Sequence, residues 1–253
     1  SNSRETFVLV NNWFMIFYLI TVLLGTVYPI FTEVLTNHKV SVGPPFYNTV
    51  IIPLVVLFLV FMSIGPNVKW IKDNYYSLNL LFKILLASIL INFLIVYFFN
   101  SYSLLSNFII ISSIFLIIST SLDFYKNLKK KSFNLSRIIS HLSFGFMILF
   151  IGLNHNFSFE RDFNLKLGDK KKFANYTIKF EKINLEEFKN YKSVVGEFNI
   201  KNYSTNLNLV LNPEIRIYEN PSTLTYEASI RSGLLRDYYM TMSNIDRSEF
   251  YNI

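Results

Sequence analysis

The sequence predicts a polytopic α-helical membrane protein with about five transmembrane helices, followed by a small β-rich external domain. Of its 253 residues, 51% are hydrophobic and 16% are charged, whereas about a quarter of the residues of a soluble domain are charged. Residues 1–159 carry 10 Lys/Arg and 4 Asp/Glu, and residues 160–253 carry 14 and 13. The low charge of the first part excludes a soluble globular fold there, and with it a soluble nucleic-acid binder.

Charge-free runs place the predicted helices. No Asp, Glu, Lys or Arg occurs at positions 6–32, 40–68, 84–122 and 138–159. A helix needs about 20 apolar residues to cross the hydrocarbon core, so three of these runs hold one helix each. The run 84–122 is too long for one helix and is interrupted by polar residues at Asn100, Ser101 and Ser103. The predicted spans lie near 8–29, 47–66, 79–99, 104–122 and 138–154, within a transmembrane domain of residues 1–155.

The basic residues between the spans predict the orientation. With five spans, nine basic residues fall on one side of the membrane and only Lys39 falls on the other. Because Lys and Arg are enriched in cytoplasmic loops, the nine are expected in the cytoplasm. The loop 30–46 and everything after residue 155 are then expected on the external side. The nine residues are Arg4, Lys69, Lys72, Lys83, Lys126, Lys129, Lys130, Lys131 and Arg137.

Residues 156–253 are expected to form the external β-rich domain. Apolar and polar residues alternate in short stretches there, which is typical of half-buried strands. Turn sequences such as Asn212-Pro213 and Asn220-Pro221 separate the stretches. About 95 residues are enough for a modest core without disulfides. The stretches are Tyr176–Phe180, Gly196–Ile200, Leu207–Leu211 and Ile215–Tyr218.

Histidines are the candidates for chemistry. His38 and His155 fall in external polar segments and are expected to be solvated, whereas His141 lies about one turn inside the fifth span. Ionisable side chains inside a membrane are costly and tend to be functional, although a structural histidine remains an alternative. Gly145 and Gly152 share the face of His141. They predict a flat clearing for a porphyrin plane or, alternatively, close packing between helices.

No two histidines of this chain can share one iron. His141 and His155 are 14 residues apart, or about 21 Å along a helix, and His38 is expected on the opposite side of the bilayer. A second axial ligand must therefore come from outside this chain. The absence of cysteine excludes disulfides, thiolate metal sites, a catalytic thiol and covalent haem attachment to this chain.

The segment at 41–48 is the most distinctive string. Two prolines stiffen it, a glycine permits an unusual φ, and two aromatic residues suit a membrane interface. Alone it favours a rigid turn that returns the chain to the membrane. Its residues are Ser41, Val42, Gly43, Pro44, Pro45, Phe46, Tyr47 and Asn48.

A series of strings in order along the chain resembles the C-terminal portion of the CcmF family, the haem lyase subunit of cytochrome c maturation. The first strings are Ser3-Arg4-Glu5 with Asn11-Asn12, Gly25-Thr26-Val27-Tyr28-Pro29, the segment 41–48, and Gly65-Pro66 with Trp70. The later ones are Ser140-His141-Leu142-Ser143, Pro213-Glu214-Ile215-Arg216-Ile217-Tyr218, and Glu227-Ala228-Ser229-Ile230 with Arg236-Asp237-Tyr238-Tyr239. The chain begins with Ser and is expected to be a fragment.

This resemblance implies a role in attaching haem covalently to apocytochrome c. It implies a membrane-embedded haem b with His141 as one axial ligand and its partner ligand elsewhere. The implied partners are other cytochrome c maturation subunits, a haem chaperone and apocytochrome c, in a bacterial or mitochondrial inner membrane. We expect the segment 41–48 to shape the external surface by which haem enters, without supplying an axial ligand.

Two departures limit what the resemblance implies. The Trp-rich external segment of the family lies upstream of the first matching string, and the last membrane helix of the family follows its external domain. Neither is found in this sequence, so the chain alone is expected to be inactive and its catalytic residues are not assigned. Two other readings stay open: a transporter or respiratory-complex membrane subunit, and a structural membrane anchor that presents a β-domain.

Overall fold

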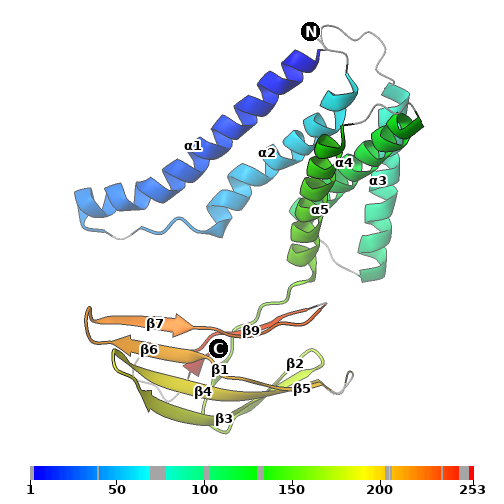
Figure 1. Cartoon of the computed structure of the whole chain (residues 1–253). Coiled ribbons are helices and arrows are strands. Elements are labelled where there is room, and N and C mark those ends of the chain that lie inside the picture. The colour runs from blue at the N-terminus through cyan, green and yellow to red at the C-terminus, as the bar shows by residue number, and fades with distance from the viewer. Residues whose placement is uncertain are drawn as a thin grey trace. The chain divides into compact units, whose positions relative to one another are not determined.

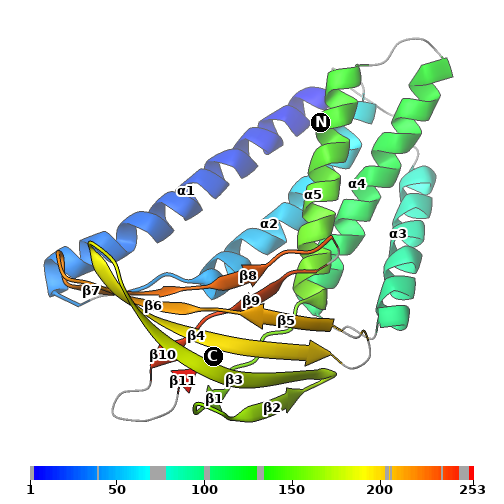
Figure 2. The same cartoon turned by 60° about the horizontal axis from the view of Figure 1, so that its bottom comes forward.

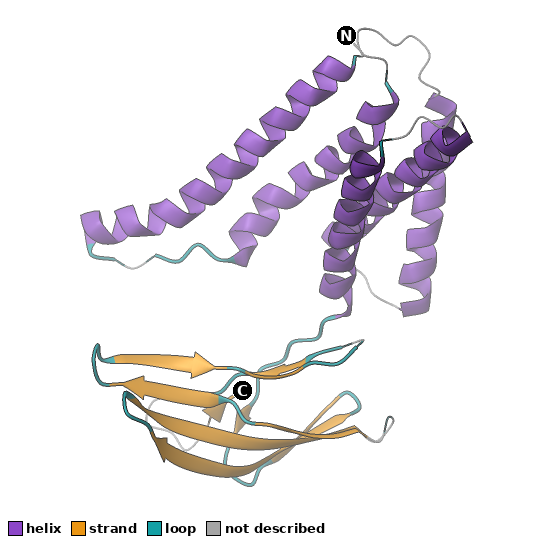
Figure 3. Cartoon of the chain, viewed as in Figure 1, coloured by secondary structure: helices purple, strands orange, loops and turns teal. Residues whose placement is uncertain are grey.

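A computed structural model describes residues 3–38, 40–68, 78–99, 103–129, 134–202, 205, 207–234, 236–244 and 251–253. The chain divides into two compact units, Ser1–Ser158 and Phe159–Ile253. Figure 3 separates them by secondary structure, because the first is helical and the second is built from strands. The division falls three residues after the boundary that the sequence suggested. Each unit is described by itself.

Within its described residues, the first unit contains five long helices and one short 3₁₀ turn (Figure 1). The helices are α1 (Arg4–Thr36), α2 (Pro44–Ile64), α3 (Leu78–Phe99), α4 (Leu104–Lys129) and α5 (Leu135–Phe157), with the 3₁₀ turn η1 at Gly65–Asn67. All five helices are long and apolar enough to cross a membrane. The predicted fold class, a polytopic helical protein followed by a β-rich domain, is confirmed.

Several helices extend beyond the charge-free runs. Helix α1 begins after Ser3, whose hydroxyl accepts a hydrogen bond from the Thr6 amide as an N-cap. It ends at Asn37, which has a left-handed φ of 55°. Helix α4 continues to Lys129. Charged residues mark where the hydrocarbon ends, but they favour helix as much as apolar residues do. Charge-free runs therefore predict the membrane-spanning part and miss the ends.

The segment at 41–48 is a loop only in its first half. Residues 41–43 are extended or irregular, whereas Pro44 begins α2. The expectation of a rigid loop over the whole segment is therefore wrong for residues 44–48. Proline suits the first helical positions, because its fixed φ is already helical and its missing N–H would have no partner there.

Helix α4 lies at the centre of the first unit. It packs against α2, α3 and α5, whereas α1 packs only against α2 and η1 among the elements with extensive contacts. In the 18-residue apolar stretch of each helix, 56% of α4 is buried, compared with 11% of α1. Ile110 and Leu116 of α4 are fully buried. Figure 2 shows α1 and α2 running side by side along their length.

The second unit is built around an antiparallel six-stranded sheet. Its order is β2-β3-β4-β6-β7, with β5 paired to β4. The strands are β2 (Lys170–Phe173), β3 (Tyr176–Glu187), β4 (Tyr191–Asn202), β5 (Leu207–Leu211), β6 (Glu214–Tyr218) and β7 (Thr223–Glu227). Smaller pairings join β1 (Asn164–Leu165), β10 (Ser243–Asn244) and β11 (Tyr251–Asn252), and β8 (Ser229–Arg231) with β9 (Tyr238–Met240).

The core of the second unit lies on one face of the large sheet. Phe180 and Phe198 are fully buried and stack with ring centroids 4.3 Å apart. Met240 and Met242 close this core from the last third of the domain. The four predicted strands lie within β3, β4, β5 and β6. Alternation in the sequence thus located the strands, and β3 and β4 extend beyond the predicted stretches.

Candidate functional site

His141 is placed by the first turns of α5. The helix begins after Asn134, whose side-chain oxygen accepts a hydrogen bond of 3.1 Å from the Arg137 amide. Residues four apart share a helical face, so the side chains of Arg137 and His141 lie on the same side of α5. Within the described residues, no hydrogen bond to the His141 imidazole is found. The ring is half-buried and is available to a ligand.

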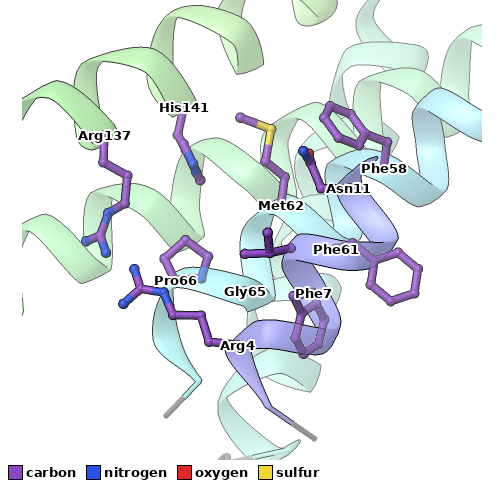
Figure 4. Close-up of a pocket in the computed structure, with 11 residues that line it drawn as sticks. Arg4, Phe7, Asn11, Phe58, Phe61, Met62, Gly65, Pro66, Arg137 and His141 are labelled. Atoms are coloured by element: carbon purple, nitrogen blue, oxygen red, sulfur yellow. The ribbon is translucent and has the colours of Figure 1, made fainter. Parts of the chain in front are cut away.

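A cavity of about 200 Å³ lies beside His141. Figure 4 shows its side chain pointing into this cavity together with side chains of α1, α2 and η1. The walls are mainly apolar, and among the described lining residues two are arginines and none is acidic. The lining residues are Arg4, Phe7, Val8, Asn11, Phe58, Phe61, Met62, Gly65, Pro66, Arg137 and His141.

Close packing of α1 on η1 forms one wall of the cavity. A Cβ atom on Gly65 would lie 3.3 Å from Cβ of Phe7, so a side chain at position 65 would press on α1. The Phe7 ring lies 5.6 Å from that of Phe61. The Phe58 ring lies 5.8 Å from that of Phe144 in α5. Gly65 and these rings therefore hold the three helices around His141.

Charge near the cavity is partly balanced from α4. The Arg137 guanidinium donates to the Asp123 carboxylate, which also accepts a hydrogen bond from the Asn127 side chain at 2.7 Å. Asp123 therefore holds Arg137 beside His141. Across the described ranges, no group of three or more His, Asp and Glu side chains could hold a metal ion. Among the described residues that line the cavity, the His141 imidazole and the Met62 thioether are the side chains of a type that can ligate haem iron.

Gly145 and Gly152 form no clearing. A Cβ on Gly145 would lie 2.9 Å from Cγ1 of Ile117, and one on Gly152 would lie 3.1 Å from side-chain atoms of Ile109 and Ile110. All three isoleucines belong to α4, so the glycine face of α5 is filled by the neighbouring helix. The expectation of haem clearance at Gly145 is therefore wrong. Both glycines serve close helix packing instead.

The other two histidines lie far from this cavity. His155 is in the last turns of α5, where its Nδ1 lies 2.8 Å from Oγ of the buried Ser106 in α4. It is thus a hydrogen-bonded helix-end residue rather than a freely solvated one. His38 is exposed beyond the end of α1. Neither histidine lines the cavity that contains the His141 side chain.

The segment 41–48 contacts α1 at the end opposite the cavity. A Cβ on Gly25 would collide with the ring and hydroxyl of Tyr47, so Tyr47 rests on the α1 backbone. Phe46 and Tyr47 lie edge to face with centroids 5.3 Å apart. Because α1 and α2 are antiparallel neighbours, the structure does not bring this segment to His141.

Two of the strings singled out in the second unit, Pro213–Tyr218 and Glu227–Ile230, contribute to a polar cluster on the sheet. The Arg216 guanidinium donates to Glu214 at 2.9 Å and lies 5.0 Å above the Tyr191 ring. The hydrogen bond to Glu214 raises the pKa of Arg216 above its usual value. Glu227 of β7 lies 3.9 Å away. These contacts tie β4, β6 and β7 together.

Sequence reasoning missed most of the cavity. The sequence analysis used Arg4 and Arg137 as indicators of membrane orientation, and Arg4 also as part of a matching string. Asn11 and Gly65 entered only as parts of matching strings. The sequence offered one indication of these residues, because Arg4, Gly65 and His141 each belong to a string that resembles the family. The structure brings these three strings together around the cavity.

Comparisons with known proteins point to one family. Residues 156–251 match the family model described as the CcmF C-terminal β-sandwich. The chain is 31% identical to the cytochrome c-type biogenesis protein CcmF of Pseudomonas fluorescens and 26% identical to that of Escherichia coli strain K12. Each alignment covers 95% of this chain and 38% of the relative. The chain thus spans about two fifths of the length of these relatives.

A solved structure supports the fold. The cytochrome c heme lyase CcmF has the same arrangement with a TM-score of 0.70 and 18% sequence identity. The match covers 99% of this chain and 41% of that chain. Both units therefore follow a known architecture.

Proposed function

The chain belongs to the CcmF family, to whose C-terminal portion it corresponds, and from this premise we propose that it acts in cytochrome c biogenesis as part of a haem lyase. In this role it helps attach haem covalently to apocytochrome c. The reaction joins two cysteine thiols of the apocytochrome to the haem vinyl groups as thioethers. Because this chain has no cysteine, both thiols come from the partner.

We further propose that His141 is one axial ligand of a membrane-embedded haem b. The observation that carries this proposal is the cavity beside His141, which three family-like strings line together. Neutral imidazole is a common ligand of haem iron. When bound, the haem supplies a one-electron redox centre. The residues fit this group as part of a site: an imidazole without a hydrogen-bonding partner among the described residues, apolar walls and two guanidinium groups.

The size of the cavity fits only part of the group. Sites for whole ligands occupy about 300–1,000 Å³, more than the 200 Å³ beside His141. This difference in volume supports the proposal that the rest of the haem would be held outside this cavity, with its second axial ligand supplied from outside this chain, as the spacing of the histidines suggests. In this arrangement Arg4 and Arg137 would bind the acidic substituents of the haem, and Asp123 would keep Arg137 oriented toward the cavity.

The remaining assignments follow from the orientation. The basic asymmetry between loops supports the proposal that the second unit lies on the external side of a bacterial or mitochondrial inner membrane. There it meets the haem chaperone, apocytochrome c and other maturation subunits. The segment 41–48 lies on the external side in the same orientation. It shapes the surface by which haem enters, without supplying a ligand.

Chemical rescue tests the role of His141 in the whole protein in its membrane. His141→Gly should lose the reduced-minus-oxidised b-type spectrum while its amount in the membrane stays normal. Added imidazole should restore this spectrum, because a free ligand can fill the space of the missing side chain. His38→Gly is the matched control, since that exposed residue should leave the spectrum unchanged. A full b-type spectrum in His141→Gly without imidazole would overturn the assignment.

A further inference from the structure

The β8–β9 hairpin presents an apolar surface that the domain does not use. Ile230 and Tyr239 face each other across the two strands and are 59% and 66% exposed. Leu234, in the turn between the strands, is completely exposed. An isolated exposed apolar residue needs no explanation. Three on one hairpin, two of them directly paired, mark a surface built to be covered.

The hairpin is rigidly attached, so this exposure is not an effect of a loose loop. The Gly233 amide donates a hydrogen bond of 3.1 Å to the Asp237 carboxylate across the turn. On the inner face, Met240 is buried in the core of the domain. The Asn212 amide donates to the Ser229 hydroxyl at 2.9 Å. The domain thus holds one face of the hairpin firmly and leaves the other outward.

The turn end of this hairpin, where Tyr238 pairs with Arg231, lies near the end of the domain that the connection from α5 enters. The Tyr238 ring of β9 lies 6.0 Å from that of Tyr176. Tyr176 pairs directly with Phe173 across β2 and β3. The Phe173 ring in turn lies 5.8 Å from that of Phe163, where the connection from α5 joins the sheet. Two ring contacts and one strand pairing therefore link the connection to the turn end of the hairpin.

The connection between the two units is short. Helix α5 ends at Phe157, and the backbone of Phe163 is bonded in both directions to Ile253 at 2.9 Å. Six peptide units between them reach at most about 20 Å. A domain of this size has a radius of gyration of about 12 Å. Such a short connection also gives a high effective concentration, so that even a weak surface contact is populated.

We propose that the β8–β9 hairpin docks on the lipid bilayer, with Ile230, Leu234 and Tyr239 in the interfacial region. Tyrosine is enriched at that depth, where its ring is apolar and its hydroxyl remains hydrated. The exposed Arg231 lies beside these residues and can extend to lipid phosphates while its stem covers apolar surface. The docked hairpin fixes how the second unit is presented above the membrane. This inference does not depend on haem or on the side of the membrane.

Fluorescent labelling in vesicles tests the proposal. The chain has no cysteine, so Leu234→Cys gives a single attachment site for an environment-sensitive dye. The whole protein is reconstituted in phosphatidylcholine–phosphatidylglycerol vesicles with a shallow nitroxide-labelled phospholipid. The matched control is Leu185→Cys, because Leu185 is 81% exposed and lies nine residues further along β3 than Tyr176, about 30 Å away.

Lipid contact predicts several-fold stronger nitroxide quenching at position 234 than at position 185, with a blue-shifted emission. Ile230→Cys reports on the same outer face and should be quenched like Leu234→Cys, which guards against a local defect in one variant. Equal, weak quenching at 230, 234 and 185 would overturn the proposal. So would a label at 234 that is shielded from aqueous iodide but not quenched by the lipid nitroxide, since a protein surface would then cover the hairpin.

Discussion

The two units bury different kinds of side chain. In the β unit the fully buried residues include the stacked Phe180 and Phe198. In the helical unit large aromatic residues such as Trp13 are 71% exposed, whereas Ser88, Ser106 and Ser113 are buried almost completely. The buried serines contact backbone or neighbouring polar groups, as Ser113 does by donating to the Ile109 carbonyl at 2.7 Å.

This difference reflects the solvent around each unit. Water drives large apolar side chains into the core of the β unit. Lipid is as apolar as the side chains it surrounds, so small residues that let helices approach closely decide the packing of the helical unit. The stability of the β unit should therefore be most sensitive to substitutions that make a buried side chain smaller. The stability of the helical unit should be most sensitive to substitutions that make a small side chain larger.

The largest effect is expected from truncating the β core. Phe198→Ala removes a fully buried ring and its stacking partner, at a cost of about 3–5 kcal/mol in the free energy of unfolding. Hydrogen exchange of the second unit within the whole chain measures this loss. Trp13→Ala in α1 should change the stability of the helical unit by no more than about 0.5 kcal/mol. A comparable loss of stability in Trp13→Ala would contradict the conclusion that large side chains stabilise the two units differently.

An intermediate effect is expected from adding one methyl group between α4 and α5. Gly145→Ala places a Cβ 2.9 Å from Ile117, and overpacking of this kind costs about 1–3 kcal/mol. Unfolding in mixed detergent micelles reports the change. Gly43→Ala is the control, because its Cβ would meet only Pro45 at 3.6 Å. Ile117→Ala should restore the stability of Gly145→Ala, and failure to do so would place the cause elsewhere.

The smallest effect concerns surface charge in the β unit. Glu187 and Glu219 lie 3.5 Å from the Lys192 ammonium and raise the pKa of Lys192. A group whose pKa is higher in the folded state stabilises the fold at pH values below its unfolded-state pKa. This stabilisation is lost as the pH rises through its folded-state pKa. Lys192→Met should therefore slightly lower the melting temperature of the unit near neutral pH, and this difference should disappear at a pH above the raised pKa of Lys192. The difference should also vanish in high salt; persistence there would exclude an electrostatic origin.

Sequence reasoning located the elements better than it located the site. Charge-free runs and alternation reflect the solvent of each element, so five helices and the main strands could be predicted. Contacts between helices leave no such pattern. Whether Gly145 faces a ligand or Ile117 depends on how α5 is turned against α4, and the hydrogen bond between His155 and Ser106 joins residues 49 positions apart. The cavity beside His141 exists only because α1, η1 and α5 meet.

The contacts between α1 and α2 limit where the chain can change length. Phe7 rests on Gly65 at one end of this pair, and Tyr47 rests on Gly25 at the other. The two contacts on α1 are 18 residues apart, or about 27 Å of helix. One residue inserted between them would turn one contact about 100° away from its partner. Insertions and deletions are therefore excluded within this stretch of α1, whereas the connection at 37–43 can lengthen without disturbing either contact.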